Sequence, residues 1–279
     1  MRYSYFGIGF FFFFFLNAQE EISGFRYLRH NEQGYPLYEH TGFADKKATS
    51  LVFVLLPGGT FEMGSTGSDP LRYPDELYHQ IHLSDRFLMA ETELTQKIWT
   101  QVMETTPWKN QKGQEFVKEG EDLPAVYLSW EDCQQFCERT GLQLPTEEMW
   151  EYSCRANAKT PFYWGLQVHN DYLWYQENTW KKDEKWAHPV KQKKPNAFGL
   201  YDMLGNVWEW CQDIYQPYQL QPNKEKKTDP PATAESFRVN RGGAFLLEAQ
   251  DCRSSVRNYV SQNRKGFALG VRFTYLLPK

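Results

Sequence analysis

The chain has 279 residues, of which 41% are hydrophobic and 24% are charged, and its formal net charge is -4. Aromatic residues make up 17% of it, which excludes a predominantly disordered chain, because disordered chains hold few aromatic residues. The weakly acidic balance gives no reason to expect nucleic acid as a partner.

The N-terminus predicts a secretory signal peptide over residues 1–18. Arg2 precedes an apolar run from Phe6 to Leu16, and Ala18 is a small residue before a polar segment. A membrane anchor and a buried strand are the alternatives, but the run is shorter than the roughly 20 apolar residues that span a bilayer. No later segment is long and apolar enough for a membrane helix. We therefore expect an exported protein (periplasmic, cell-surface or secreted) without a membrane span.

Residues 19–48 are polar, and we expect an N-terminal extension that packs against a domain formed by residues 49–279. The apolar run Leu51–Leu56 predicts a buried strand. A Pro-Gly-Gly turn follows it, and Thr60–Met63 is expected to be the returning strand of a hairpin. Residues 79–95 alternate and predict another pair of strands.

Three short helices are expected to follow, each after a hydroxyl residue that can cap its first turn. Thr95 precedes the first. Ser129 precedes the second, with Asp132 three residues later and Gly141 as a natural end. Thr146 precedes the third. Beyond residue 157 periodic patterns nearly disappear, and dense aromatic residues favour ordered strand-and-turn segments without long elements.

Five cysteines could carry chemistry, form disulfides or fill space. An exported protein can keep disulfides, but an odd number leaves at least one thiol unpaired within a monomer. No phosphate-binding glycine loop, Ser-His-Asp set or zinc motif accompanies them. The cysteines are Cys133, Cys137, Cys154, Cys211 and Cys252.

Six strings in order carry a family resemblance: LPGGTFEMGS, LSWEDCQQFCERTG, LPTEEMWEYSCRA, PNAFGLYDMLGNVWEWCQD, RVNRGGAF and GVRF. Together they resemble the sulfatase-modifying-factor family, whose founding member is formylglycine-generating enzyme, over Leu51 to Phe273. The resemblance implies a single α+β domain of the formylglycine-generating-enzyme type, related to C-type lectins, with low regular secondary structure.

The resemblance also implies a copper oxidase that uses molecular oxygen and two cysteines to convert a sulfatase cysteine to formylglycine. Cys252 stands at the second cysteine position, but Leu247 stands at the first. Ala244 replaces the family serine, and Glu248 replaces the histidine. Cu(I) prefers thiolate ligands, and Leu247 has no lone pair to offer. Recruitment of Cys211 as a substitute ligand stays open.

Two interpretations of Cys252 follow. It is either a buried, unreactive thiol, or a reactive one whose pKa is lowered by Arg253 and Arg257. The resemblance places a substrate groove at Trp208, Ala244, Phe245 and Glu248. We expect Arg241, Arg257 and Arg272 to pair with Glu151, Glu209 or other acidic residues of the loop-rich half, and the resemblance does not indicate which.

In the family, the string that corresponds to DMLGNVWE binds calcium. The resemblance implies side-chain ligands from Asp202 and Glu209 and backbone oxygens from Gly205 and Val207, a mixture that suits a hard cation. The alternative is a set of hydrogen bonds that stabilises the turn. A second family calcium site begins at a position matched by Asn178 and Thr179, but Lys182 stands where its aspartate should be. Asp183 lies one residue away.

Three functions are consistent with these observations. The first is an exported, catalytically degenerate accessory protein that binds a peptide, glycan or protein ligand in the groove, with calcium. The second is a divergent copper-dependent oxidase that still makes formylglycine. The third follows the family's iron-dependent sulfur-inserting enzymes and pigment-maturation factors, which usually carry an added helical domain that we do not expect in this chain.

Overall fold

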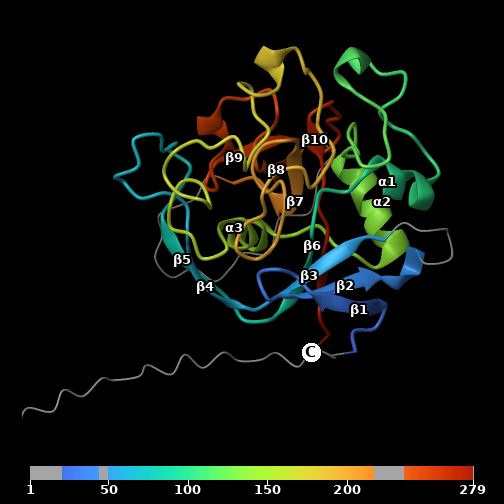
Figure 1. Ribbon diagram of the computed structural model, residues 1–279, viewed down its shortest axis with the longest axis horizontal. Helices are drawn as coiled ribbons and strands as arrows, with labels where there is room; N and C mark the ends of the chain where they lie inside the picture. Colours follow the sequence, from blue (N-terminus) through green and yellow to red (C-terminus); the bar gives the residue numbers. More distant parts are fainter. Residues whose placement is uncertain (1–20, 44–49, 217–235, 279) are drawn as a thin grey trace, which may run out of the picture.

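The computed structural model describes residues 21–43, 50–216 and 236–278. The predicted signal peptide lies outside these residues. Three sheets, three α-helices and four short 3-10 helices make up the regular structure of the described chain (Figure 1). The strands are β1 (Phe25–His30), β2 (Pro36–His40), β3 (Val52–Leu56), β4 (Gly59–Met63), β5 (His79–Leu83), β6 (Phe87–Ala90), β7 (Trp208–Ile214), β8 (Phe237–Arg241), β9 (Arg257–Ser261), β10 (Leu269–Gly270) and β11 (Thr274–Leu276). The helices are α1 (Gln96–Met103), α2 (Trp130–Thr140) and α3 (Glu147–Arg155).

The first sheet has the order β1-β2-β3-β6-β11, so the C-terminal strand lies beside strands from the start of the chain. The predicted buried strand is β3, but its predicted partner was wrong. β2 and β6 occupy its two edges, antiparallel in both cases. Thr60–Met63 therefore leaves the sheet as β4 and pairs with β5 in a separate two-stranded sheet.

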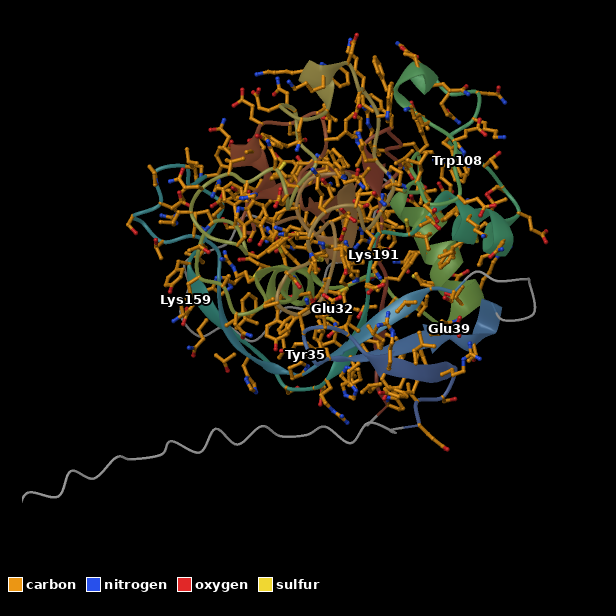
Figure 2. All side chains as sticks on the ribbon, viewed as in Figure 1. Glu32, Tyr35, Glu39, Trp108, Lys159 and Lys191 are labelled. Carbon is orange, nitrogen blue, oxygen red and sulfur yellow. The ribbon has the colours of Figure 1, made fainter. Side chains whose placement is uncertain are left out.

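The predicted N-terminal extension supplies β1 and β2, which continue the first sheet rather than merely packing against it. The register of β1 against β2 shifts between Tyr27 and Arg29, and this irregularity interrupts the alternation expected of a strand. The sheet therefore starts before residue 49, the expected start of the domain. Figure 2 shows the side chains of the described residues, with Glu39 of β2 among those labelled.

All three helices begin where the capping residues predict. Thr95, Ser129 and Thr146 each accept a hydrogen bond from a backbone N–H of the first turn. Ser129 and Asp132 form a reciprocal capping box, and Gly141 ends α2 in the left-handed conformation. None of the helices of the described residues is both long enough and apolar enough to cross a membrane.

The second sheet, of order β10-β7-β8-β9, lies above the first in Figure 1, with α3 below it. Long loops connect its strands, as the aperiodic second half of the sequence predicts. The observed architecture is a single α+β domain with little regular secondary structure.

Candidate functional site

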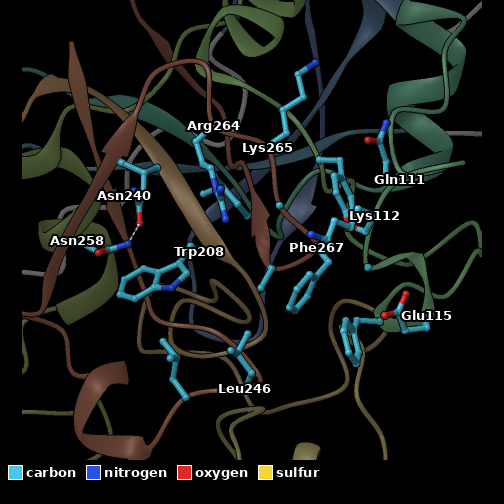
Figure 3. Close-up of a pocket in the computed structure, with 18 residues that line it drawn as sticks. Gln111, Lys112, Glu115, Trp208, Asn240, Leu246, Asn258, Arg264, Lys265 and Phe267 are labelled. Atoms are coloured by element: carbon cyan, nitrogen blue, oxygen red, sulfur yellow. Dashed lines mark hydrogen bonds between the residues drawn. The ribbon is translucent and has the colours of Figure 1, made fainter. Parts of the chain in front are cut away.

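A cavity of about 750 Å³ opens beside the second sheet (Figure 3). One wall comes from the start of β7, from β8 and from β9, through Trp208, Asn240 and Asn258. The loop after β9 supplies a second wall, which includes Phe267. Residues 111–116, far away in the sequence, supply the third. The pocket therefore depends on tertiary contacts between segments that lie far apart in the sequence.

The tandem glycines after β8 bring the chain back toward this pocket. Gly242 and Gly243 have φ values of 101° and 81°, which glycine adopts without a steric penalty. A Cβ on Gly243 would lie 2.4 Å from the Sγ of Cys252. Glycine is thus required at position 243 both for the turn and for the close approach of Cys252.

Cys252 has no solvent-exposed surface. Its thiol lies 3.9 Å from the carbonyl oxygen of Ala244 and packs in a small apolar cluster with Leu173 and Tyr175. Burial raises the pKa of Cys252 to about 12. Arg253 binds Glu76 and Asp69 instead of activating this thiol. The side chain has the character of a buried neutral thiol rather than that of a nucleophile.

Leu247 contacts both the pocket and the cluster that contains Cys252. Of the four residues predicted to form the groove, Trp208 lines the pocket, whereas Ala244 and Phe245 are fully buried. Glu248 is exposed outside the lining. Ala244 and Phe245 are buried because the turn after Gly243 directs them into the core.

The residues present do not fit a two-thiolate copper site. All five cysteines are buried and free of disulfides. Cys252 lacks a thiol partner at Leu247, and Cys211, the proposed substitute, lies in a different core cluster. Within the described ranges, no three His, Cys, Asp or Glu side chains are grouped so that they could hold a metal ion.

Buried arginines bind the second sheet to α3, as the sequence predicted. Arg241 pairs with Glu151 and Glu147, and Arg257 pairs with Glu147 at 2.6 Å. The positions of these charges are therefore explained by the scaffold, and they are not available to a ligand.

The predicted calcium ligands divide into two groups. Both carboxylate oxygens of Glu209 accept hydrogen bonds from Arg272, and one also accepts from the indole of Trp150. Glu209 could bind a cation only by exchanging these partners. Asp202 differs, because one of its oxygens accepts from the N–H of Lys191 while the other is buried without a partner among the described residues. Of the two predicted side-chain ligands, Asp202 is the one that offers an unpartnered oxygen to a hard cation.

Asp202 lies near two other buried carboxyl groups, those of Glu93 and Glu209. Burial raises the pKa of Asp202 to about 6, and burial together with the charges of Asp202 and Glu209 raises the pKa of Glu93 well above its ordinary value. Glu93 accepts hydrogen bonds from Asn206 and from the N–H of Val207. Glu93 is the acidic residue of this cluster that no sequence motif pointed to.

The residues at the second predicted calcium position form a hydrogen-bonded turn. The Asn178 side chain accepts from the N–H of Tyr175 and donates to the carbonyl of Leu173. The hydroxyl of Thr179 donates to the carbonyls of Tyr175 and Phe245. Both side chains are thus engaged in local hydrogen bonds.

Taken together, the two larger sheets, the loop-rich half and the pocket define a single-domain α+β protein with a surface pocket. A profile of the Sulfatase-modifying factor enzyme 1-like domain matches residues 40–275, and the chain belongs to this family. The resemblance of the six sequence strings is thereby confirmed.

Relatives in this family carry differing activities in their names. The chain is 28% identical over 188 residues to the formylglycine-generating enzyme of Bos taurus, a match that covers 62% of this chain and 50% of that protein. It is 34% identical over 176 residues to the inactive C-alpha-formylglycine-generating enzyme 2 of Bos taurus, covering 59% and 53%. The chain spans about half the length of these curated relatives.

Solved structures support the fold. Treponema denticola variable protein 1 superposes with a TM-score of 0.68 at 22% identity, covering 83% of this chain and 97% of that one. At this level of identity the similarity establishes the architecture and not the activity.

Proposed function

We propose that this chain is an exported binding protein of the family that does not generate formylglycine. The observation that carries the proposal is the pair of positions 247 and 252. A leucine stands where the family pattern has the first cysteine, and Cys252 is enclosed with a pKa of about 12. A neutral, buried thiol next to an aliphatic side chain offers neither a nucleophile nor a copper ligand pair.

The pocket supports the binding half of the proposal. Its volume of about 750 Å³ is within the range that accommodates a ligand the size of a short peptide segment or a small molecule. Trp208 and Phe267 give it aromatic surface, which contributes large contact area at low entropic cost. Leu247 stands in this lining where the family has a reactive cysteine. A ligand that contacts Leu247 would therefore be bound but not chemically modified.

The test is an activity assay with a matched variant. The purified chain is incubated with Cu(I), oxygen and a peptide that contains Cys-x-Pro-x-Arg, and mass spectrometry follows the conversion of thiol to aldehyde. The formylglycine-generating enzyme of Bos taurus serves as the positive control. We expect no aldehyde from this chain. Turnover that is lost in Cys252→Ser would sink the proposal and establish the alternative, a divergent copper-dependent oxidase.

We also propose that calcium binds at Asp202, with backbone oxygens from Gly205 and Val207. The unpartnered oxygen of Asp202 and the surplus of buried carboxylates around it support this proposal. Glu209 joins the ion only where Arg272 releases it, so Asp202 is the residue on which the proposal depends.

A further inference from the structure

The rim of the pocket carries basic side chains that no motif accounts for. Lys112, Arg264 and Lys265 are exposed and come from two loops on different sides of the cavity (Figure 3). Lys265 forms an ion pair with Asp132 at 2.6 Å. Lys112 and Arg264 have no ion-pair partner among the described residues. Glu115 is the one acidic side chain in the lining, so the rim has a surplus of unpaired positive charge.

The wall beneath this rim is aromatic and aliphatic. Phe116 and Phe267 pack with their ring centroids 5.0 Å apart, and the half-buried Trp208 lies across the cavity from them (Figure 3). Leu246 and Val260 complete the apolar surface. Such a surface favours a flat or bulky apolar group of a ligand. The hydroxyl groups of a sugar would lose their hydrogen bonds to water there without replacement.

The polar groups in the wall formed by β8 and β9 include a free donor. The amide of Asn258 donates to the side-chain oxygen of Asn240 at 2.6 Å. The Nδ2 group of Asn240 is buried and has no hydrogen-bond partner among the described residues. The amide of Asn240 and the side chains of Lys112 and Arg264 are thus hydrogen-bond donors that a ligand could satisfy. The complementary ligand is rich in hydrogen-bond acceptors.

We propose that this pocket binds an acidic peptide segment in which a carboxylate side chain lies next to an aromatic or large aliphatic one. The inference rests on the proposed binding function and names its ligand class. The carboxylates would meet Arg264 and Lys112 at the rim, and the apolar side chain would pack between Trp208 and Phe267. A peptide that carries arginine would meet like charge at the same rim, and such juxtaposition disfavours binding.

A random heptapeptide library displayed on phage tests the ligand class directly. The library is selected on the full chain, and the enriched peptides are resynthesised and measured by fluorescence anisotropy. We expect enriched sequences with net negative charge and at least one aromatic residue, with affinity that falls as salt is added. Arg264→Glu should weaken binding by about tenfold or more, because it places a negative charge at the rim that repels the acidic peptide.

Lys159→Glu is the matched control, since it makes the same change of charge at an exposed lysine outside the pocket (labelled in Figure 2). It should leave the affinity within about twofold. Both positions are exposed, so neither substitution endangers folding. Trp208→Ala provides a second test, with circular dichroism as the check on its fold.

The outcomes separate the ligand class from the binding function. Neutral or basic peptides that need Trp208 would overturn the acidic class and leave the binding function standing. Heparin that binds with dependence on Arg264, where no peptide does, would replace the peptide with an anionic glycan. Failure of every peptide and of heparin to bind in a Trp208-dependent way would overturn both proposals.

Discussion

The guanidinium of Arg272 donates hydrogen bonds to both carboxylate oxygens of Glu209, and the two side chains are 0% and 1% exposed. Arg272 also donates to the carbonyls of Ala90 and Tyr201, while Glu209 accepts from Trp150. One ion pair thus connects β6, α3, β7 and the segment before β11. Buried polar groups therefore connect the first sheet, through β6, to the second sheet, through β7.

We expect Arg272→Met to lower the free energy of unfolding by about 3–5 kcal/mol, because it leaves the Glu209 carboxylate buried without its charge partner. Urea denaturation followed by tryptophan fluorescence measures the change. Arg26→Met is the control, since Arg26 pairs with Glu39 but its side chain is 68% exposed. Its cost should be below about 1 kcal/mol. Equal losses in the two variants would contradict the role of burial.

The five thiols should be silent toward a thiol reagent in the native protein. Burial raises the pKa of each of them, to about 12 for Cys137, Cys154 and Cys252. At pH 8 only about one Cys252 side chain in ten thousand is then a thiolate. Titration with Ellman's reagent should find almost no reactive thiol in buffer and five in guanidinium chloride. A fast-reacting native thiol that disappears in Cys252→Ser would show that this site opens.

Local signals in the sequence were sufficient for the helices and for the family. The capping hydroxyls of Thr95, Ser129 and Thr146 act within one turn, so the helix starts could be predicted. Strand partners could not, because pairing depends on contacts across the whole chain. The hydroxyl of Thr274, for example, donates to the carbonyl of Leu88 from 186 residues away. For this reason β4 was assigned to the wrong partner.

The site shows the same division. The family-like sequence strings pointed to Leu247, Cys252 and Trp208, because the spacing of these residues within the strings is fixed. The opposite wall of the pocket comes from residues 111–116, which carry no motif. Their position depends on tertiary contacts such as the hydrogen bond from the Tyr127 hydroxyl to the carbonyl of Lys112, at 2.7 Å. The basic rim could therefore not be predicted from the sequence, because it combines Lys112 with Arg264 from a distant loop.

Calcium should raise the melting temperature of the chain, and a chelator should lower it again, because an ion that binds only the folded state stabilises that state. Asp202→Asn should remove this response, since it replaces the unpartnered carboxylate oxygen and its charge. Asp171→Asn is the control, because Asp171 is an exposed partner of Lys194. Differential scanning calorimetry with and without calcium measures both. An unchanged melting temperature in the wild-type chain would mean that no calcium binds at Asp202.

Gly243 and Gly141 allow the close approach of Cys252 to be measured by itself. Both glycines have positive φ, 81° and 74°, so alanine at either position incurs a backbone penalty of about 1–2 kcal/mol. A new Cβ at position 141 would meet nothing within 4 Å, whereas at position 243 it would lie 2.4 Å from the Sγ of Cys252 and 2.9 Å from its Cα. Gly243→Ala should therefore destabilise the protein by about 1–3 kcal/mol more than Gly141→Ala, the cost of overpacking a filled interior.

Urea denaturation of the two variants gives this difference, and Cys252→Ala separates its sources. In the Cys252→Ala background the sulfur is gone but the Cα of residue 252 stays, so the excess cost at Gly243 should shrink without disappearing. If Gly243→Ala and Gly141→Ala were equally destabilising, Cys252 would not be pressed against the glycine turn. The thiol would then have room to move toward Leu247 and the pocket, which would weaken the case for an inert cysteine.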